Sequence, residues 1–110
     1  MHKDTLGEFE QLVLLASLRL GEEAYAVSII EEIERHTGRR PSHGAVFVAV
    51  RRLEKKGLVR TQLGDATTER GGRPPRMVRV EREAIRRLRE SRAALLSLWA
   101  DLDVITDGLE

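Results

Sequence analysis

The spacing of apolar residues changes its period twice along the chain, and this order constrains the fold more than any other feature. Apolar residues recur at helical spacing in three segments, at about 5–20, 24–37 and 42–56. Two short extended runs follow, at 58–63 and 77–80. Helical spacing then returns up to about residue 102. The sequence therefore predicts a mainly α-helical chain with one small β-hairpin.

Local residues predict where these helices begin and end. Thr5, with Glu8 three residues later, is typical of a capping box at the start of the first helix. Ser42 follows Pro41 directly and is the expected N-cap of the third helix. The second helix is expected to bury its isoleucines and to turn its glutamates toward water: Glu31, Glu32 and Glu34.

The third helix is predicted to have two unlike faces. At about 100° per residue, Val46, Val50 and Leu53 share one face, which suits a core. The opposite face has small residues near its start and cations near its end: Gly44, Val48, Arg51, Arg52 and Lys55. An ordinary solvated face is the alternative, and the position opposite the apolar residues favours a binding role.

The chain has 110 residues and no cysteine, which limits how it can be stabilised. A domain of this size is often marginal alone, and the usual remedies are disulfides, a metal or a partner chain. Disulfides are excluded, and the histidines at positions 2, 36 and 43 lack the spacing of metal ligands. We therefore expect no metal, no cofactor and an oligomer.

The net charge of +1 conceals a strong segregation of charge. Residues 1–34 have an excess of six negative charges, residues 35–79 an excess of nine positive charges, and residues 80–110 an excess of two negative charges. Some clustering is inevitable in a chain that is one-third charged. A basic middle between acidic ends nevertheless favours a localised surface for a polyanion.

Three helices followed by a hairpin form the pattern of a winged helix-turn-helix, in which the second helix of the motif enters the major groove of DNA. Residues 1–80 are the predicted DNA-binding unit, and the loop of the hairpin is the predicted wing. The expected DNA contacts are Ser42, His43, Gly44, Phe47, Val48, Arg51, Arg52 and Lys55 on the third helix and Arg70, Arg73 and Arg76 on the wing.

Residues 81–110 are predicted to form a C-terminal dimerisation helix and a short acidic tail. Steps of three and four residues connect Ile85, Leu88, Leu95, Trp99 and Leu102, and Arg92 occupies the remaining position of this heptad stripe. Arg92 either pairs with an acid across a dimer or extends to water. Trp99 is expected in the dimer interface, with stacking on a ligand as the alternative.

The motifs of the third helix resemble those of the PadR-like transcriptional regulators. The family pattern is Ser-x-Gly-x-x-Tyr-x-x-Leu-x-x-Leu-Glu-x-x-Gly-Leu-Ile/Val. It maps onto Ser42, Gly44, Phe47, Val50, Leu53, Glu54, Gly57, Leu58 and Val59. The resemblance covers roughly residues 6–102, and the wing sequence at 70–73 is also similar to that of many members.

The resemblance implies a homodimeric repressor that binds an inverted-repeat operator. Members with a single C-terminal helix dimerise through it against the partner's N-terminal helix, which implies an interface that includes Phe9 and Leu12. Some members sense planar apolar compounds at that interface, which makes Trp99 a candidate ligand contact for a small apolar aromatic effector. A ligand-responsive sensor is compatible with the repressor.

The chain departs from the family pattern at two places. Phe47 stands where the family usually has tyrosine, and it lacks a hydroxyl for a phosphate. The returning strand at 76–80 lacks the aromatic residues that relatives often have there. The loss of the hydroxyl favours an alternative, a winged-helix protein-interaction module without DNA binding, whereas the nine-charge excess opposes it.

Other classes of function find little support. The serines lack a histidine and an acid at a recognisable spacing, and no glycine-rich phosphate loop follows a strand, so an enzyme is not expected. No apolar stretch approaches the ~20 residues that span a bilayer. The N-terminal residues have no basic segment followed by an apolar one. We expect a cytoplasmic protein without membrane insertion.

Overall fold

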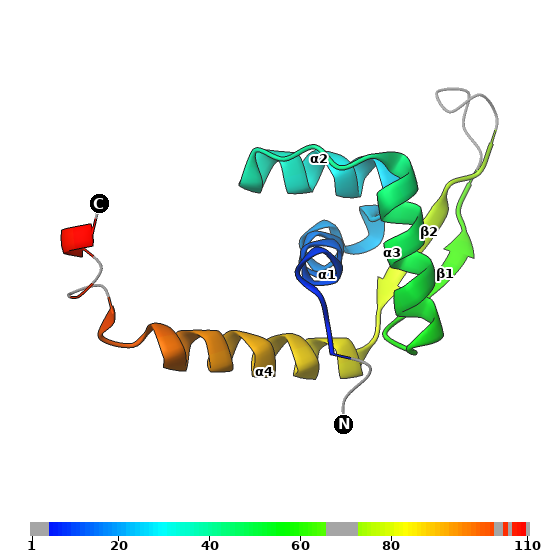
Figure 1. Cartoon of the computed structure of the whole chain (residues 1–110). Helices are drawn as coiled ribbons and strands as arrows, with labels where there is room; N and C mark the ends of the chain where they lie inside the picture. The colour runs from blue at the N-terminus through cyan, green and yellow to red at the C-terminus, as the bar shows by residue number, and fades with distance from the viewer. Residues whose placement is uncertain (1–4, 66–72, 103–104, 106, 110) are drawn as a thin grey trace.

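The computed structural model describes residues 5–65, 73–102, 105 and 107–109. It confirms a mainly α-helical fold with one antiparallel β-hairpin (Figure 1). The elements in chain order are α1 (Glu8–Leu20), the 3-10 helix η1 (Gly21–Glu23), α2 (Ala26–Thr37), α3 (His43–Lys55), β1 (Val59–Leu63), β2 (Arg76–Val80), α4 (Arg82–Trp99) and the 3-10 helix η3 (Asp107–Leu109).

Helix α1 is the central element of the fold. It packs against α2, α3 and β2, which surround it in Figure 1. The core contains side chains from all of these elements: Val13, Leu14, Ile29, Ile30, Val46, Leu53, Leu58 and Val78. Each fully buried Leu or Ile stabilises the fold by about 1.5–3 kcal/mol. Helix α1 is apolar over most of its circumference because neighbouring elements cover it on several sides.

The predicted start of the first helix is wrong. Helix α1 begins at Glu8, with Gly7 as its N-cap, so Thr5 lies two residues before the N-cap position that was predicted for it. The carboxylate of Glu10 accepts a hydrogen bond from the Gly7 N–H at 3.1 Å. Leu6 is buried, so the chain reaches the helix in an extended conformation with its apolar side chain in the core. The tertiary position of Leu6 and Glu10 thus overrides the local capping signal.

The caps of the other two N-terminal helices follow the sequence more closely. The Ser42 hydroxyl accepts a hydrogen bond from the Ala45 N–H at 3.0 Å, which confirms the predicted N-cap of α3. Gly38 ends α2 in the left-handed conformation with φ 78°. Helix α2 starts two residues later than expected, because Tyr25 is extended and its N–H donates to the Ser28 hydroxyl at 3.0 Å.

The two strands form a short ribbon on the side of α3. Thr61 faces Val78 in the antiparallel register, and the Gly64 N–H donates to the Pro75 carbonyl at 2.7 Å beyond the last paired residues. The Val78 N–H also donates to the Ala24 carbonyl at 2.9 Å, which joins β2 to the segment between α1 and α2. This hydrogen bond attaches the middle of β2 to the helical core.

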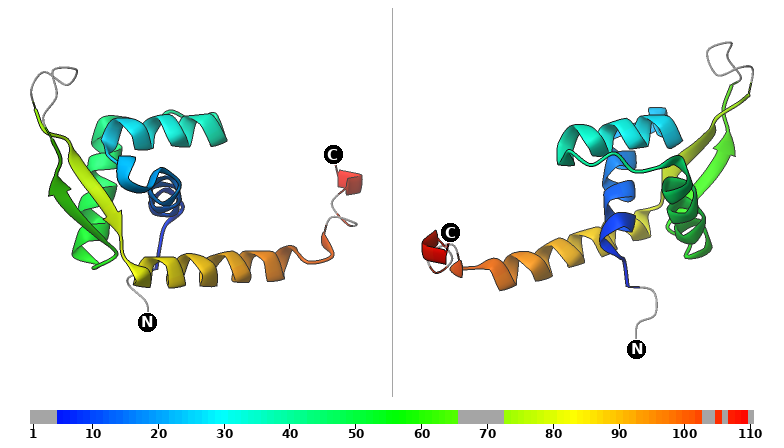
Figure 2. Two further views of the ribbon diagram at one scale, coloured as in Figure 1. Left: turned by 180° about the vertical axis from the view of Figure 1, so that it is seen from behind. Right: turned by 45° about the horizontal axis from the view of Figure 1, so that its top comes forward.

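Helix α4 leaves the body of the molecule. Figures 1 and 2 show it running past α1 and extending beyond the other elements. Only Ala84 and Leu88 on this helix are buried. The helix ends at Trp99, three residues before the predicted end, because Asp101 has a positive φ of 67°. Leu102 therefore lies beyond the helix that was expected to contain it.

Candidate nucleic-acid interface

The two predicted faces of α3 differ in exposure as the sequence indicates. Val46, Ala49, Val50 and Leu53 are buried against the core. The outer face of α3 consists of exposed residues: Gly44, Phe47, Val48, Arg51, Arg52 and Lys55. Phe47 and Val48 are 58% and 47% exposed, which is unusual for large apolar side chains that a fold has no reason to leave in water.

The first turn of α3 is open to solvent. Ser42, His43 and Gly44 are all exposed, and the Ser42 hydroxyl is occupied as the N-cap. A Cβ added at Gly44 would meet only the Ser42 hydroxyl, at an ordinary contact distance of 3.9 Å. Packing within the chain therefore does not require a glycine at position 44.

One aromatic contact organises the middle of the outer face. The guanidinium carbon of Arg51 lies 5.6 Å from the centroid of the Phe47 ring, one helical turn away. This distance is within the range of a cation–π interaction, which favours Arg over the face of an aromatic ring. The sequence predicts both residues as DNA contacts but does not place Phe47 on this face, and it misses their contact, although the i, i+4 spacing carries the signal.

The wing is tied to α3 through a chain of side chains. Arg76 donates to the Thr61 hydroxyl at 3.0 Å, and that hydroxyl donates to the Glu54 carboxylate at 2.9 Å. Arg76 and Arg73 are exposed, whereas Arg70 lies outside the described residues. Glu54 and Thr61 were absent from the predicted site, because nothing local in the sequence relates them to Arg76.

An ion pair joins the beginning of α1 to the end of α3. The Lys56 ammonium lies 3.1 and 3.2 Å from the two carboxylate oxygens of Glu10, and both side chains are largely buried. The same carboxylate receives the Gly7 N–H. Lys56 is thus a structural residue, unlike Arg52, one turn earlier, and Lys55, the preceding residue, which are both exposed.

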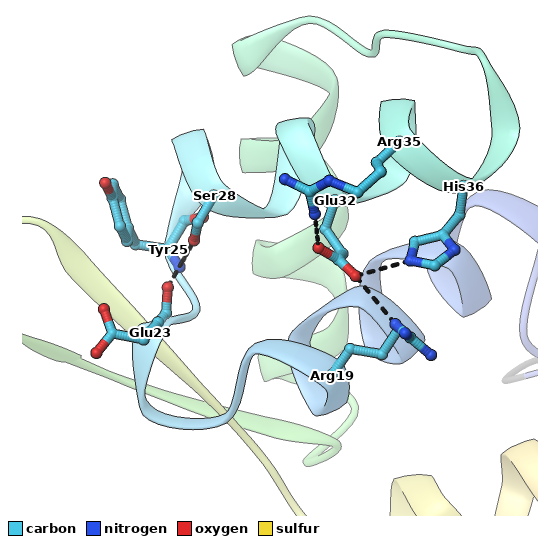
Figure 3. A network of polar contacts seen from close by, with 7 residues as sticks. All are labelled: Arg19, Glu23, Tyr25, Ser28, Glu32, Arg35 and His36. Atoms are coloured by element: carbon cyan, nitrogen blue, oxygen red, sulfur yellow. Dashed lines mark hydrogen bonds and ion pairs between the residues drawn. The ribbon is translucent and has the colours of Figure 1, made fainter.

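The expectation that Glu32 faces water is wrong. Glu32 is 7% exposed and receives Arg19 from α1, at 2.9 Å, together with Arg35 and His36 of its own helix (Figure 3). The hydrogen bond from Arg19 lowers the pKa of the Glu32 carboxyl most, burial opposes this, and His36 and Arg35 lower the pKa further. Arg19 crosses from another helix, so the spacing within α2 could not reveal the pair.

The described residues contain no cluster of three His, Cys, Asp or Glu side chains that could hold a metal ion. None of the helices in the described part of the chain is long and apolar enough to cross a membrane.

A three-helix core, a two-stranded wing and an exposed cationic helix define the class of winged-helix DNA-binding regulators. The chain belongs to the PadR-like family of transcriptional regulators, whose family model matches residues 14–77. This membership confirms the resemblance seen in the motifs of α3. The family is one of DNA-binding transcriptional regulators and not of enzymes.

Solved structures agree with this assignment. A PadR family transcriptional regulator from Eggerthella lenta is 26% identical, with a TM-score of 0.66 over 94% of this chain and 87% of that one. The protein in the complex structure of hsRosR-S1 is 27% identical in sequence. The TM-score is 0.64, over 89% of this chain and 80% of that one. A PadR-like transcription factor from Bacteroides fragilis shares the fold at 21% identity, with a TM-score of 0.69 over 88% of each chain. No relative was found among curated proteins.

Proposed function

We propose that the chain is a homodimeric transcriptional repressor that reads an inverted-repeat operator in double-stranded DNA. The observation that carries this proposal is that the cations on the outer face of α3 are exposed and lack ion-pair partners in the described part of the chain. Arg51, Arg52 and Lys55 are exposed, and none has an ion-pair partner among the residues that the structure describes. Uncompensated positive charge on one exposed helical face suits phosphates and guanine edges.

The contrast with other cations of the chain strengthens this argument. Arg19, Arg35, Arg40, Lys56, Arg60 and Arg86 each lie within ion-pair distance of a glutamate. Among the described residues, the fold therefore neutralises part of its positive charge and leaves the cations on the outer face of α3 unpaired, as it also leaves Arg82, Arg89 and Arg92 of α4. Exposed charge of either sign keeps a protein soluble. The clustering of unpaired cations on one helix beside the hairpin, however, supports a nucleic-acid partner.

Each subunit would place α3 in a major groove, with the first turn closest to the bases. Ser42, His43 and Gly44 form the start of α3, where backbone N–H groups and the positive end of the helix would meet a phosphate. The wing would contact the flanking backbone through Arg73 and Arg76, together with Arg70. Two half-sites would lie about one helical turn, ~34 Å, apart. Part of the affinity would come from counterion release, so binding should fall steeply as salt rises.

The proposed division of labour assigns residues 1–80 to DNA binding and residues 81–110 to dimerisation. A groove of about 500 Å³ between α1 and α4 supports this assignment, since mostly apolar residues line it. On α4 these include Ile85, Leu88, Leu95 and Trp99, with Arg92 at the same groove. On α1, Leu15 and Leu18 are the exposed residues, whereas Phe9 and Leu12 are half-buried against the subunit's own core. We therefore extend the proposed interface to Leu15 and Leu18.

The first test is selection of genomic DNA fragments by the purified protein at moderate salt, followed by sequencing of the bound fraction. A shared inverted repeat is the expected result and would supply the operator. Weak, salt-sensitive binding without a shared sequence would contradict sequence-specific regulation. That outcome would favour a winged-helix module that binds another protein through the exposed Phe47 and Val48.

The second test assigns the reading helix. The double variant R51A/R52A should lose at least about tenfold in operator affinity, since one good base or phosphate contact contributes about 1–3 kcal/mol. The matched control is R82A, which removes an exposed arginine from the start of α4. Fluorescence anisotropy with labelled operator would measure both. Unchanged affinity in R51A/R52A would refute the role of α3.

A ligand-responsive form of the same regulator has one observation in its favour. Trp99 is 56% exposed and lines the apolar groove between α1 and α4. We propose that a planar apolar aromatic compound stacks there and changes operator affinity. Quenching of Trp99 fluorescence by such compounds would report binding directly, because the chain contains a single tryptophan. Absence of quenching across a panel of planar aromatics would count against an effector site at this residue.

A further inference from the structure

Val48 is an apolar residue near the middle of the cationic outer face of α3. Helical periodicity places it between Gly44, one turn earlier, and Arg51 and Arg52, about one turn later. Its side chain is 47% exposed. Valine is also a poorer helix former than alanine, glutamate or lysine, because its branched Cβ loses rotamer freedom in a helix. Burial within the chain and helix propensity therefore both give weak reasons for a valine at this position.

The space beside Val48 is open toward the start of the helix. Side chains of an α-helix tilt toward its N-terminus, so the Val48 side chain leans over the turn that contains Gly44 and Ala45. Gly44 has no side chain, Ala45 has only a methyl group, and both residues are exposed. They line one open groove together with Val48 and Arg52. A group of a partner molecule can therefore reach the Val48 methyls without meeting a larger side chain from that turn.

The chemistry of this face selects the kind of group that fits Val48. Arg51, Arg52 and Lys55 have no ion-pair partner among the described residues, and such cations suit the phosphates and guanine edges of DNA. Val48 has neither a donor nor an acceptor, so it cannot replace the water that a phosphate or a polar base edge would lose. In the major groove, thymine is the base that presents an apolar group, its C5 methyl.

We propose that Val48 contacts the C5 methyl of a thymine in each half-site of the operator. This inference rests on the proposed function and names the base that one residue of α3 reads. The contact removes water from two apolar groups. A cytosine, adenine or guanine at the same position would instead present a hydrogen-bonding edge to a side chain that cannot pair with it. Val48 thus contributes to sequence specificity, whereas cations that meet phosphates contribute affinity without reading the sequence.

Phe47 is the other large apolar residue exposed on this face, and it fits the role less well. Its ring already contacts the Arg51 guanidinium, 5.6 Å from the ring centroid. At about 100° per residue, Phe47 lies about 70° from the direction opposite the buried residues of α3, whereas Val48 lies about 30° from it. Val48 is therefore nearer to the line along which the helix would face the floor of the groove.

Removal of one methyl group from the DNA tests the contact. The probe is the inverted repeat that the fragment selection recovers, in which each symmetry-related pair of thymidines is replaced in turn by deoxyuridine. Uracil differs from thymine only by the missing C5 methyl. Fluorescence anisotropy with the full chain measures the affinity for each duplex. At one pair of positions the wild type should lose about tenfold, because burial of one methyl group contributes about fourfold in each half-site.

The variant V48A shows whether valine makes this contact. V48A should bind the thymine duplex more weakly than wild type, and the deoxyuridine penalty at that pair should disappear. The variant should fold, since Val48 is exposed and alanine is the better helix former, and circular dichroism checks this. The matched control F47A removes the adjacent exposed apolar side chain and its contact with Arg51, and it should keep the deoxyuridine penalty.

Three results would overturn the inference alone: no deoxyuridine position that weakens wild-type binding, a penalty that persists in V48A, or a penalty that disappears in F47A instead. The first of these, together with unchanged operator affinity in V48A, is the outcome expected if Val48 contacts another protein. If the fragment selection recovers no shared repeat, the proposed function is overturned and this inference with it.

Discussion

Substitution of Gly44 by alanine separates what the fold requires from what a DNA partner requires. Gly44 lies in the first turn of α3 and does not have a positive φ. The added Cβ would meet only the Ser42 hydroxyl, at 3.9 Å. Alanine is better than glycine in a helix and reduces the entropy of the unfolded chain, so G44A should be more stable by about 0.4–1 kcal/mol. For a domain of this size, that raises Tm by about 2–6 °C.

The same substitution should weaken operator binding. If the first turn of α3 approaches DNA as closely as we propose, the methyl group occupies space that a phosphate or base edge needs. We expect a loss of about tenfold or more in affinity, equivalent to about 1.4 kcal/mol. Thermal unfolding and fluorescence anisotropy on the same preparation would measure the two effects.

Two results would refute this reasoning. A variant that is more stable and binds the operator as tightly as wild type would show that the start of α3 does not approach DNA closely. A variant that is less stable would show that the local packing does need glycine. The control is G57A, in which alanine must adopt a φ of 75°, so this variant should be destabilised by about 1–2 kcal/mol.

Three further predictions concern side chains that the sequence analysis either left out or, for Glu32, placed wrongly. T61V removes the hydroxyl between Arg76 and Glu54, so operator affinity should fall severalfold in anisotropy titrations while Tm changes little; a loss confined to stability would contradict a role in placing the wing. K56M leaves the Glu10 carboxylate buried without its cation, so urea unfolding should show a loss of about 1–3 kcal/mol, much of it recovered in E10Q/K56M. The folded-state pKa of Glu32 is lowered from about 4.5, so its stabilising contribution is present above that pH and is lost as pH falls through the folded-state pKa. E32Q should therefore be less stable than wild type at neutral pH, and the two curves of stability against pH should converge in acid; a constant difference would contradict the ion-pair network.

The features that could be predicted from sequence are those that local residues decide. The cap at Ser42 and the two faces of α3 depend on residues within one or two turns, and both appear as expected. The start of α1 could not be predicted in this way. Its Glu10 cap is held by Lys56, which lies 46 positions along the chain. A local capping motif at Thr5 carries no information about that contact.

The same distinction applies to the candidate site. The cationic outer face of α3 follows from helical periodicity alone, and so does the spacing that lets Arg51 meet Phe47. The link between Arg76 and Glu54 requires the register of the hairpin and its position against α3. The burial of Glu32 requires Arg19 from another helix. Polar pairs that join distant elements are therefore the part of the structure that periodicity leaves undetermined.

The contact between Phe47 and Arg51 has a consequence for the cost of binding. A free arginine side chain samples many rotamers, and its immobilisation at an interface costs about 0.5–1.5 kcal/mol. The Phe47 ring lies 5.6 Å from the Arg51 guanidinium and restricts its rotamers already in the free protein, so part of this entropy cost does not fall on binding. The aromatic ring thus supplies preorganisation, which a phenyl group provides as well as a phenol. A chain with phenylalanine at position 47 keeps this advantage even though it has no hydroxyl to offer a phosphate.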